Sequence, residues 1–168
     1  MLKPFIAGIF AAALVFQING CSTHNKSVQI GVLLPLTGSQ ANFGEMEKNS
    51  YEMLRELVNH NGGIDGIQLD FIYEDDTGKP EVGRAGAERL ININKVPLIT
   101  GGYSSSVTFS ACAVAQQYEI PFLVNTGSVD KITQPEAFNL KPNDGDKFYI
   151  YRLCPTVSEY ASTIGSFL

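Results

Sequence analysis

The sequence is poor in the residues on which many catalytic and metal sites depend. Its 168 residues include two histidines, three cysteines and no tryptophan. Three cysteines are too few for a disulfide scaffold. His24 stands in a polar segment and His60 at the end of an expected helix, so neither is placed for a Ser-His-Asp triad. The sequence contains no phosphate-binding or dinucleotide-binding glycine motif and no nucleophile elbow.

Positive charge is also scarce, with 12 basic against 17 acidic residues and a formal net charge of -5. A chain without a basic stripe cannot neutralise a phosphate backbone, so we expect no nucleic-acid partner. The apolar run Phe5–Phe16 is 12 residues long, shorter than the roughly 20 residues that cross a bilayer as a helix.

That short run belongs to a predicted leader. Residues 1–20 combine the basic Lys3, the apolar run and a small-residue end, which is typical of a secretory signal peptide. The end, Ile18-Asn19-Gly20-Cys21, resembles a bacterial lipobox, in which Cys21 becomes the lipidated first residue. The alternative is simple cleavage nearby, with Cys21 an ordinary residue. We therefore expect a polar tether at 21–27 and a lipid-anchored, extracytoplasmic protein in the periplasm or at the cell surface.

After the tether, the pattern alternates between short apolar runs and helical periodicity. Strands are predicted at 28–34, 67–73, 96–100, 120–124 and 148–153. In the first predicted helix, Met46, Ser50, Met53, Leu54, Leu57 and Val58 share one face. The expected buried sides of the next two helices are Val82, Gly86, Leu90 and Ile93, then Val107, Ala111, Val114, Ala115 and Tyr118. The alternation predicts an α/β fold with an open, mostly parallel sheet and helices on both faces.

The last segment predicts a helix with an unpartnered apolar stripe. Thr156 and Glu159 have capping-box spacing. Val157, Ala161, Ile164 and Leu168 form the stripe, which needs a covering partner.

Ligands of open parallel sheets bind at the carboxyl ends of the strands, where the candidate binding elements are the loop Pro35–Gly44 and two polar loops. The first is Gly101–Ser106, whose glycines allow close approach and whose following helix offers free amides to a carboxylate. The second is Asn125–Ser128. Neutral polar loops of this kind suit a small ligand that carries a carboxylate and an amine. The alternatives are plain N-capping for Ser104–Ser106 and a turn role for Thr126 and Ser128.

Two further features have weaker interpretations. Glu74-Asp75-Asp76 offers carboxylates to a hard cation but lacks further ligands, so we expect a solvated acidic loop, no metal site and no cofactor. Phe43 and Tyr103 are candidate apolar walls of a ligand site, with ordinary packing as the alternative.

Four sequence blocks resemble one family. They are IGVLLPLTGSQANFG (30–44), NGGIDGIQLDFIYEDDTGKPEVG (61–83), GGYSSSVTFSACAVAQQYEIPFLVNTGSVDKIT (101–133) and FYIYRLCP (148–155). Together they are similar to the branched-chain amino acid (Leu/Ile/Val) binding proteins, which have the type I periplasmic binding fold.

The resemblance implies a non-catalytic solute-binding lipoprotein of an ABC transporter, whose partners are a small amino-acid-like ligand, permease subunits and, through the lipid, the membrane. Family members close two lobes on a ligand. Residues 28–153 would be the N-terminal lobe and 154–168 the start of a second lobe that is largely missing, as in a fragment or truncated form. Carried onto this chain, the ligand-binding residues are Ser105, Ser106, Thr126, Gly127 and Ser128, with Tyr103 and Ser104 beside them.

Two other functions stay open at this point. One is a sensor or receptor domain of the same fold, and the other is a doubly wound hydrolase. The sequence leaves the ligand open among aliphatic amino acids, amides, urea-like solutes and aromatic acids.

Overall fold

A computed structural model describes residues 26–141 and 145–167. The five strands are β1 (Ser27–Leu34), β2 (Gln68–Asp75), β3 (Ile99–Gly101), β4 (Phe122–Val124) and β5 (Ile150–Arg152). The helices are α1 (Ala41–His60), α2 (Pro80–Asn92), α3 (Ser105–Gln117) and α4 (Val157–Gly165), with 3-10 turns η1 (Asp130–Thr133) and η2 (Pro135–Phe138). The predicted leader and Cys21 lie outside the described residues.

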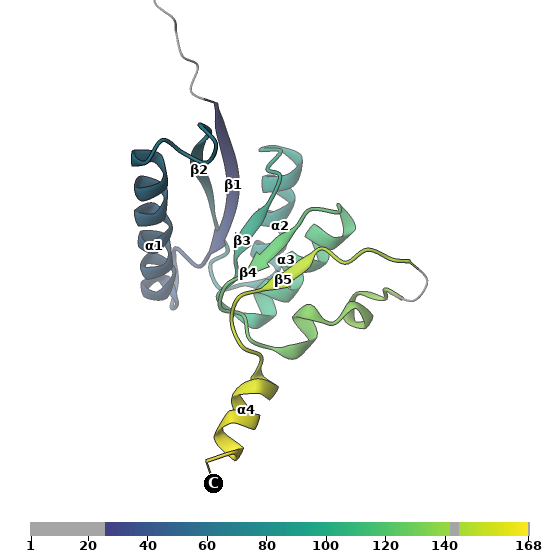
Figure 1. The fold of residues 1–168 in the computed structure, drawn as a ribbon. Helices are drawn as coiled ribbons and strands as arrows, with labels where there is room; N and C mark the ends of the chain where they lie inside the picture. The colour runs from purple at the N-terminus through teal and green to yellow at the C-terminus, as the bar shows by residue number, and fades with distance from the viewer. Residues whose placement is uncertain (1–25, 142–144, 168) are drawn as a thin grey trace, which may run out of the picture.

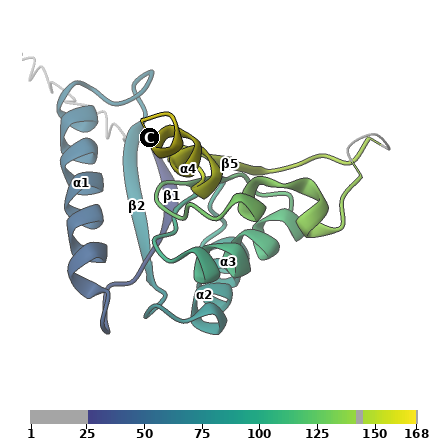
Figure 2. The same ribbon diagram turned by 90° about the horizontal axis from the view of Figure 1, so that it is seen from below.

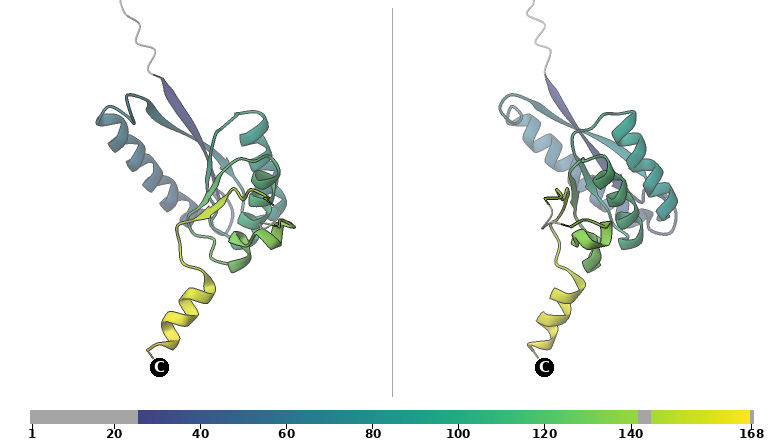
Figure 3. Two further views of the ribbon diagram at one scale, coloured as in Figure 1. Left: turned by 45° about the vertical axis from the view of Figure 1, so that its right-hand side comes forward. Right: turned by 90° about the vertical axis from the view of Figure 1, so that its right-hand side faces the viewer.

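The strands form one parallel sheet in the order β2-β1-β3-β4-β5. Figure 1 shows α1 apart from α2 and α3, and Figure 3 shows the sheet between them. The predicted α/β class, with helices on both faces of an open parallel sheet, is therefore confirmed. The loops that follow β1, β2, β3 and β4 all emerge at the same edge of the sheet, because the strands run in the same direction.

The core lies between the sheet and the α2–α3 layer. Val32, Leu33 and Leu34 at the end of β1 have no exposed surface, as the continuous apolar run predicts. A Cβ at Gly31 would lie 2.9 Å from Leu90 Cδ1, so the glycine lets α2 pack closely on β1. The α2–α3 layer therefore covers one face of the sheet.

The apolar faces of the helices are only partly where the periodicity places them. Val107, Ala111, Val114 and Ala115 of α3 are buried as predicted, but Tyr118, the residue after its last turn, is 44% exposed. Leu90 is buried, whereas Ile93 lies past the end of α2 and is 71% exposed. Both errors continue a helical period beyond the residue where the helix stops.

Helix α1 differs from α2 and α3 in the exposure of its apolar face. Its apolar face exists, but Met53 and Leu57 on that face are 69% and 61% exposed. Only Gly44 of this helix is buried. The half-buried side instead carries Glu47, Tyr51 and Asn59.

The sheet has the same asymmetry at β4 and β5. Phe122, Val124 and Ile150 point into the core, while Tyr151 is 55% exposed. Figures 1 and 3 show no helix among the described residues over these strands on the α1 side. The uncovered face of α1 and the uncovered face of β4 and β5 are thus on the same side of the molecule.

Helix α4 projects from the end of β5 away from the sheet, as Figures 1 and 3 show and Figure 2 shows from below. Thr156 and Glu159 make the predicted capping box, with Glu159 N–H donating to Thr156 Oγ1 at 3.1 Å. The apolar side chains of α4 are exposed, Val157 and Ile164 among them. The capping box and a hydrogen bond from Val157 N–H to the Ser128 carbonyl hold the first turn of this helix, while its apolar side chains stay exposed.

Candidate functional site

The Gly101–Ser106 loop leaves β3 and enters α3 beside the end of β1. Gly101 and Gly102 have positive φ angles of 106° and 85°. A Cβ at Gly101 would lie 2.3 Å from the Leu33 carbonyl oxygen, so only glycine allows this approach. The predicted need for glycine in this loop is confirmed.

Ser104 occupies the N-cap position of α3, yet its side chain makes no capping hydrogen bond. Its Oγ lies instead 3.3 Å from Ser106 Oγ. The plain capping role is thus not what Ser104 performs. The first amides of a 13-residue helix remain without a side-chain cap from Ser104, next to exposed hydroxyl groups.

The Asn125–Ser128 loop packs directly against the serine loop. Asn125 N–H donates to the Gly101 carbonyl at 3.0 Å, and Gly127 N–H donates to the Gly102 carbonyl at 2.9 Å. Val129 N–H donates to Ser105 Oγ at 3.4 Å. The structure therefore brings the two predicted loops into one rim, which we call the serine rim (residues 102–106 and 125–129).

The predicted site residues have different surroundings within this rim. The Gly127 carbonyl is taken by Arg152, and the Ser128 carbonyl accepts from Val157 N–H at 2.9 Å. Gly127 has space only for hydrogen, because a Cβ there would lie 2.9 Å from Thr108 Oγ1. The Thr126 hydroxyl is bound to a carboxylate described below.

Tyr103 and Phe43 stack on each other at the edge of the serine rim. Their ring centroids are 5.0 Å apart and the rings are nearly parallel, at 14°. Phe43 comes from the first turn of α1 and is 50% exposed. The pair forms an apolar surface beside the hydroxyls.

Arg152 of β5 supports the second loop and was not among the predicted site residues. Its Nη1 donates to the Gly127 carbonyl at 2.8 Å and its Nη2 to the Val129 carbonyl at 2.7 Å. A lone arginine in an aromatic strand gave no signal of this role, which depends on β5 lying next to β4.

Glu47 is the second missed residue. It lies one turn after Phe43 on α1, where Thr126 Oγ1 donates to its Oε1 at 2.6 Å and Asn125 Nδ2 to its Oε2 at 3.0 Å. One turn further, the Tyr51 hydroxyl is 3.0 Å from Thr100 Oγ1. Burial raises the pKa of the Tyr51 hydroxyl, and the charge of Glu47 adds to that shift.

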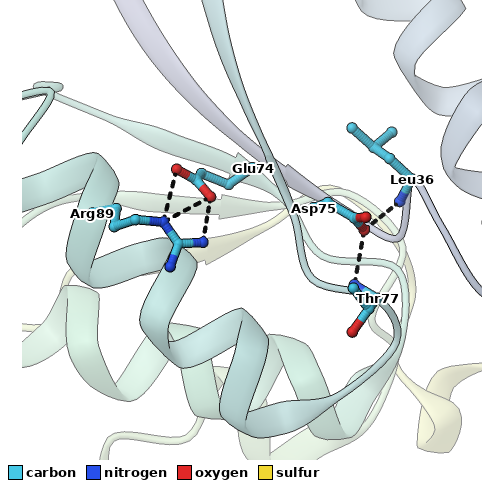
Figure 4. A network of polar contacts seen from close by, with 5 residues as sticks. All are labelled: Leu36, Glu74, Asp75, Thr77 and Arg89. Carbon is cyan, nitrogen blue, oxygen red and sulfur yellow. Dashed lines mark hydrogen bonds and ion pairs between the residues drawn. The ribbon is translucent and has the colours of Figure 1, made fainter.

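The acidic triplet is not the solvated loop that we expected, because each member has a different structural environment. Glu74 pairs with Arg89 Nη2 at 2.5 Å (Figure 4). Asp75 accepts from the amides of Leu36 and Thr77, both at 2.8 Å, and joins the loop after β1 to the loop after β2. Asp76 has no exposed surface.

These surroundings shift the pKa values of Asp75 and Asp76 in opposite directions. Burial alone would raise the pKa of Asp75, but hydrogen bonds from Thr37, Thr77 and Leu36 outweigh it and lower the pKa. Burial raises the pKa of Asp76 to about 6, against one lowering hydrogen bond from Gly78. Its Oδ2 has no partner among the described residues.

His60 lies at the other edge of the sheet from the serine rim. Its neighbour Asn59 exchanges hydrogen bonds of 2.8 and 2.7 Å with the backbone of Leu69, near the start of β2. The structure therefore does not bring His60 to the serines.

Within 26–141 and 145–167, no group of three or more His, Cys, Asp or Glu residues is arranged to hold a metal ion. None of the helices in that part of the chain has the length and hydropathy to span a membrane.

The sheet order and the rim at its carboxyl edge define a lobe of the type I periplasmic binding fold. Two of the solved structures that share this fold illustrate the match. The branched-chain amino acid transporter substrate-binding protein of Streptococcus pneumoniae, in complex with isoleucine, superposes with a TM-score of 0.67 at 23% identity, covering 78% of this chain and 34% of that one. An ABC transporter solute-binding protein of R. palustris, in complex with 4-hydroxybenzoate, superposes with a TM-score of 0.63 at 24% identity, covering 78% and 32%.

Sequence comparison assigns the family. The profile described as periplasmic binding protein matches residues 27–166. An amino acid binding protein of Pseudomonas aeruginosa is 33% identical over 133 residues, which are 79% of this chain and 35% of the relative. The chain belongs to the periplasmic binding protein family. It spans about a third of the length of the relatives it matches.

Proposed function

We propose that this chain is the N-terminal solute-binding lobe of an ABC transporter substrate-binding protein, and that it holds a small carboxylate-bearing solute at the serine rim. The proposal rests on the free hydrogen-bonding groups at the start of α3. Its first amides lack a cap from Ser104, and the hydroxyls of Ser104 and Ser106 lie beside them.

The physical basis is the affinity of a helix N-terminus for anions. Unpaired amides and the aligned peptide dipoles stabilise a negative charge there. Hydroxyl groups donate further hydrogen bonds, and the Phe43–Tyr103 stack supplies apolar surface for a side chain or ring. Ser105, Thr126, Gly127 and Ser128 shape the rim around this position.

The proposal extends to partners and location. We infer that the protein works outside the cytoplasm, anchored by lipid on Cys21, and that it delivers its solute to permease subunits without chemical change. The family, the leader pattern and the position of His60 far from the serines support this. One of the solved structures holds an amino acid and the other an aromatic acid, so both solute classes enter the test.

The test is solute binding by the 168-residue chain, followed through backbone amide signals in NMR titrations with L-leucine and with 4-hydroxybenzoate. We expect at least one solute to shift the signals of residues 103–107 and 126–129. Ser106→Ala should weaken that binding about fivefold, or about 1 kcal/mol, because a hydrogen bond to a charged group is lost at a partly wet site.

Ser110→Ala is the matched control, since Ser110 lies one turn further along α3 and its hydroxyl donates to the Ser106 carbonyl at 3.1 Å. That variant should bind as the natural chain does. Shifts confined to residues away from the rim, or equal weakening by both variants, would contradict the proposed site.

A further inference from the structure

A cavity of about 390 Å³ opens between α1 and the loop after β4. It adjoins the serine rim through Thr126, which belongs to both. Its lining combines one carboxylate, polar groups and two larger side chains: Glu47, Ser50, Tyr51, Leu54, Asn125 and Thr126. A cavity with this mixture suits a small solute that carries a polar group next to an aliphatic part.

Glu47 has acceptor capacity left in this cavity. A carboxylate offers about four acceptor positions, and the bonds from Thr126 and Asn125 use one on each oxygen. Both of these donors are neutral. The remaining positions favour a donor that also brings positive charge, because hydrogen bonds between ions are the stronger ones.

The charge of Glu47 is not balanced within the described residues. Among them, the ion pairs join Arg55 to Glu52, Arg84 to Glu88 and Arg89 to Glu74, and none includes Glu47. Lys48 is directed to β2, where its Nζ lies 5.0 Å from the centre of the Tyr73 ring. A half-buried carboxylate without a counter-ion is costly, and a cationic solute group would reduce that cost.

We infer that Glu47 binds a primary ammonium group of the solute, with Tyr51 and Leu54 against the neighbouring carbon atoms. This inference rests on the proposed function and makes it narrower. It assigns specificity to a residue on α1. Glu47 increases the binding affinity of amino acids and amines, but not that of acids without an amino group.

The test uses the full 168-residue chain and three solutes that share the carbon chain of a 3-methylbutyl group. L-Leucine carries both charged groups, 4-methylpentanoate lacks the ammonium group, and 3-methylbutylamine lacks the carboxylate. Dissociation constants from NMR titrations are compared for the natural chain and for Glu47→Gln, Glu47→Asp and Glu45→Gln. Glu45 is an exposed acid two residues earlier on the same helix and serves as the matched control.

We expect Glu47→Gln to weaken L-leucine and 3-methylbutylamine about tenfold and to leave 4-methylpentanoate unchanged. Glu47→Asp, which keeps the charge, should retain most of the preference, and Glu45→Gln should retain all of it. The dispersion of the amide signals verifies that each variant is folded.

Three results would overturn the inference. Equal weakening of all three solutes by Glu47→Gln would show that Glu47 only ties α1 to the β4 loop. Unchanged binding of L-leucine and 3-methylbutylamine would remove Glu47 from the site, while the proposed function survives if 4-methylpentanoate still binds at the serine rim. Binding of none of the three solutes, nor of 4-hydroxybenzoate, would overturn the proposed function as well.

Discussion

Asp75 and Asp76 are neighbours in the chain, but the fold treats their carboxyl groups differently. Asp75 is an acceptor for the loops after β1 and β2, and its pKa is lowered. Asp76 is fully buried with one unpartnered oxygen, and its pKa is raised to about 6. Alternation along the end of β2 points the two side chains to different sides, which explains the difference.

The raised pKa of Asp76 predicts that the free energy of unfolding depends on pH. Between its ordinary pKa of 3.8 and about 6, the folded chain holds a proton that the unfolded chain releases. The contribution of Asp76 to the free energy of unfolding is therefore full below about pH 4 and falls as the pH rises towards 6. We expect Asp76→Asn, which stays neutral, to raise the free energy of unfolding at pH 7 by about 2 kcal/mol.

Urea unfolding of both chains from pH 4 to pH 7 measures this effect. The difference between variant and natural chain should grow across that range. Asp65→Asn is the control, because it makes the same substitution at an exposed aspartate. A variant that is less stable than the natural chain at every pH would contradict the assignment.

At the scale of elements, α1 and α2 show that similar apolar periodicity has two structural outcomes. Leu90 of α2 packs on Gly31 and has no exposed surface. Leu57 of α1 belongs to an equally regular apolar face but is exposed. What differs is the neighbour: α2 has both the sheet and α3 beside it, whereas α1 packs on β1 and β2 through its other side.

These two leucines predict a large difference in mutational cost. Leu90→Ala should lower the free energy of unfolding by about 3 kcal/mol, since it removes buried methyl groups and leaves a cavity. Leu57→Ala should change it by less than about 0.5 kcal/mol. Urea unfolding of the 168-residue chain measures both. Comparable losses would show that the face of α1 is covered in solution.

At the scale of the whole molecule, the described lobe has apolar surfaces on the same side as the uncovered sheet face, and α4 extends from it with an exposed stripe. Its relatives are about three times as long as the matched segment. The anchor proposed for the other end of the chain has a direct test.

We expect Cys21→Ala to move the protein from the membrane fraction to the soluble fraction of a bacterial host, because the lipid chains would supply the anchoring energy. Cell fractionation with detection of the chain measures this. Cys154→Ala is the matched control and should leave the distribution unchanged, since Cys154 lies after β5 within the described lobe. Retention of Cys21→Ala in the membrane fraction would refute lipidation.

Much of the fold could be predicted because its strands carry their own signal. The continuous apolar runs of β1 and β4 specify the strands, and Gly101 at the end of β3 and Gly102 after it mark the loop that approaches β1. The predictions for Ile93 and Tyr118 were wrong because periodicity does not indicate where a helix ends. Glu47 and Arg152 were missed because their partners lie far away in the sequence, on the loop after β4.

Local pattern in the sequence was sufficient for the α/β class, the order of elements along the chain and the two polar loops at the strand ends. Apolar periodicity and glycine placement act over a few residues, so one chain segment contains the whole signal. Only the tertiary structure decided that α1 turns its apolar side outward, that Asp75 and Asp76 differ, and that Glu47 reaches Thr126. Each of these depends on which distant segment packs alongside. That segment determines how much water, charge and hydrogen-bonding capacity surrounds the side chain.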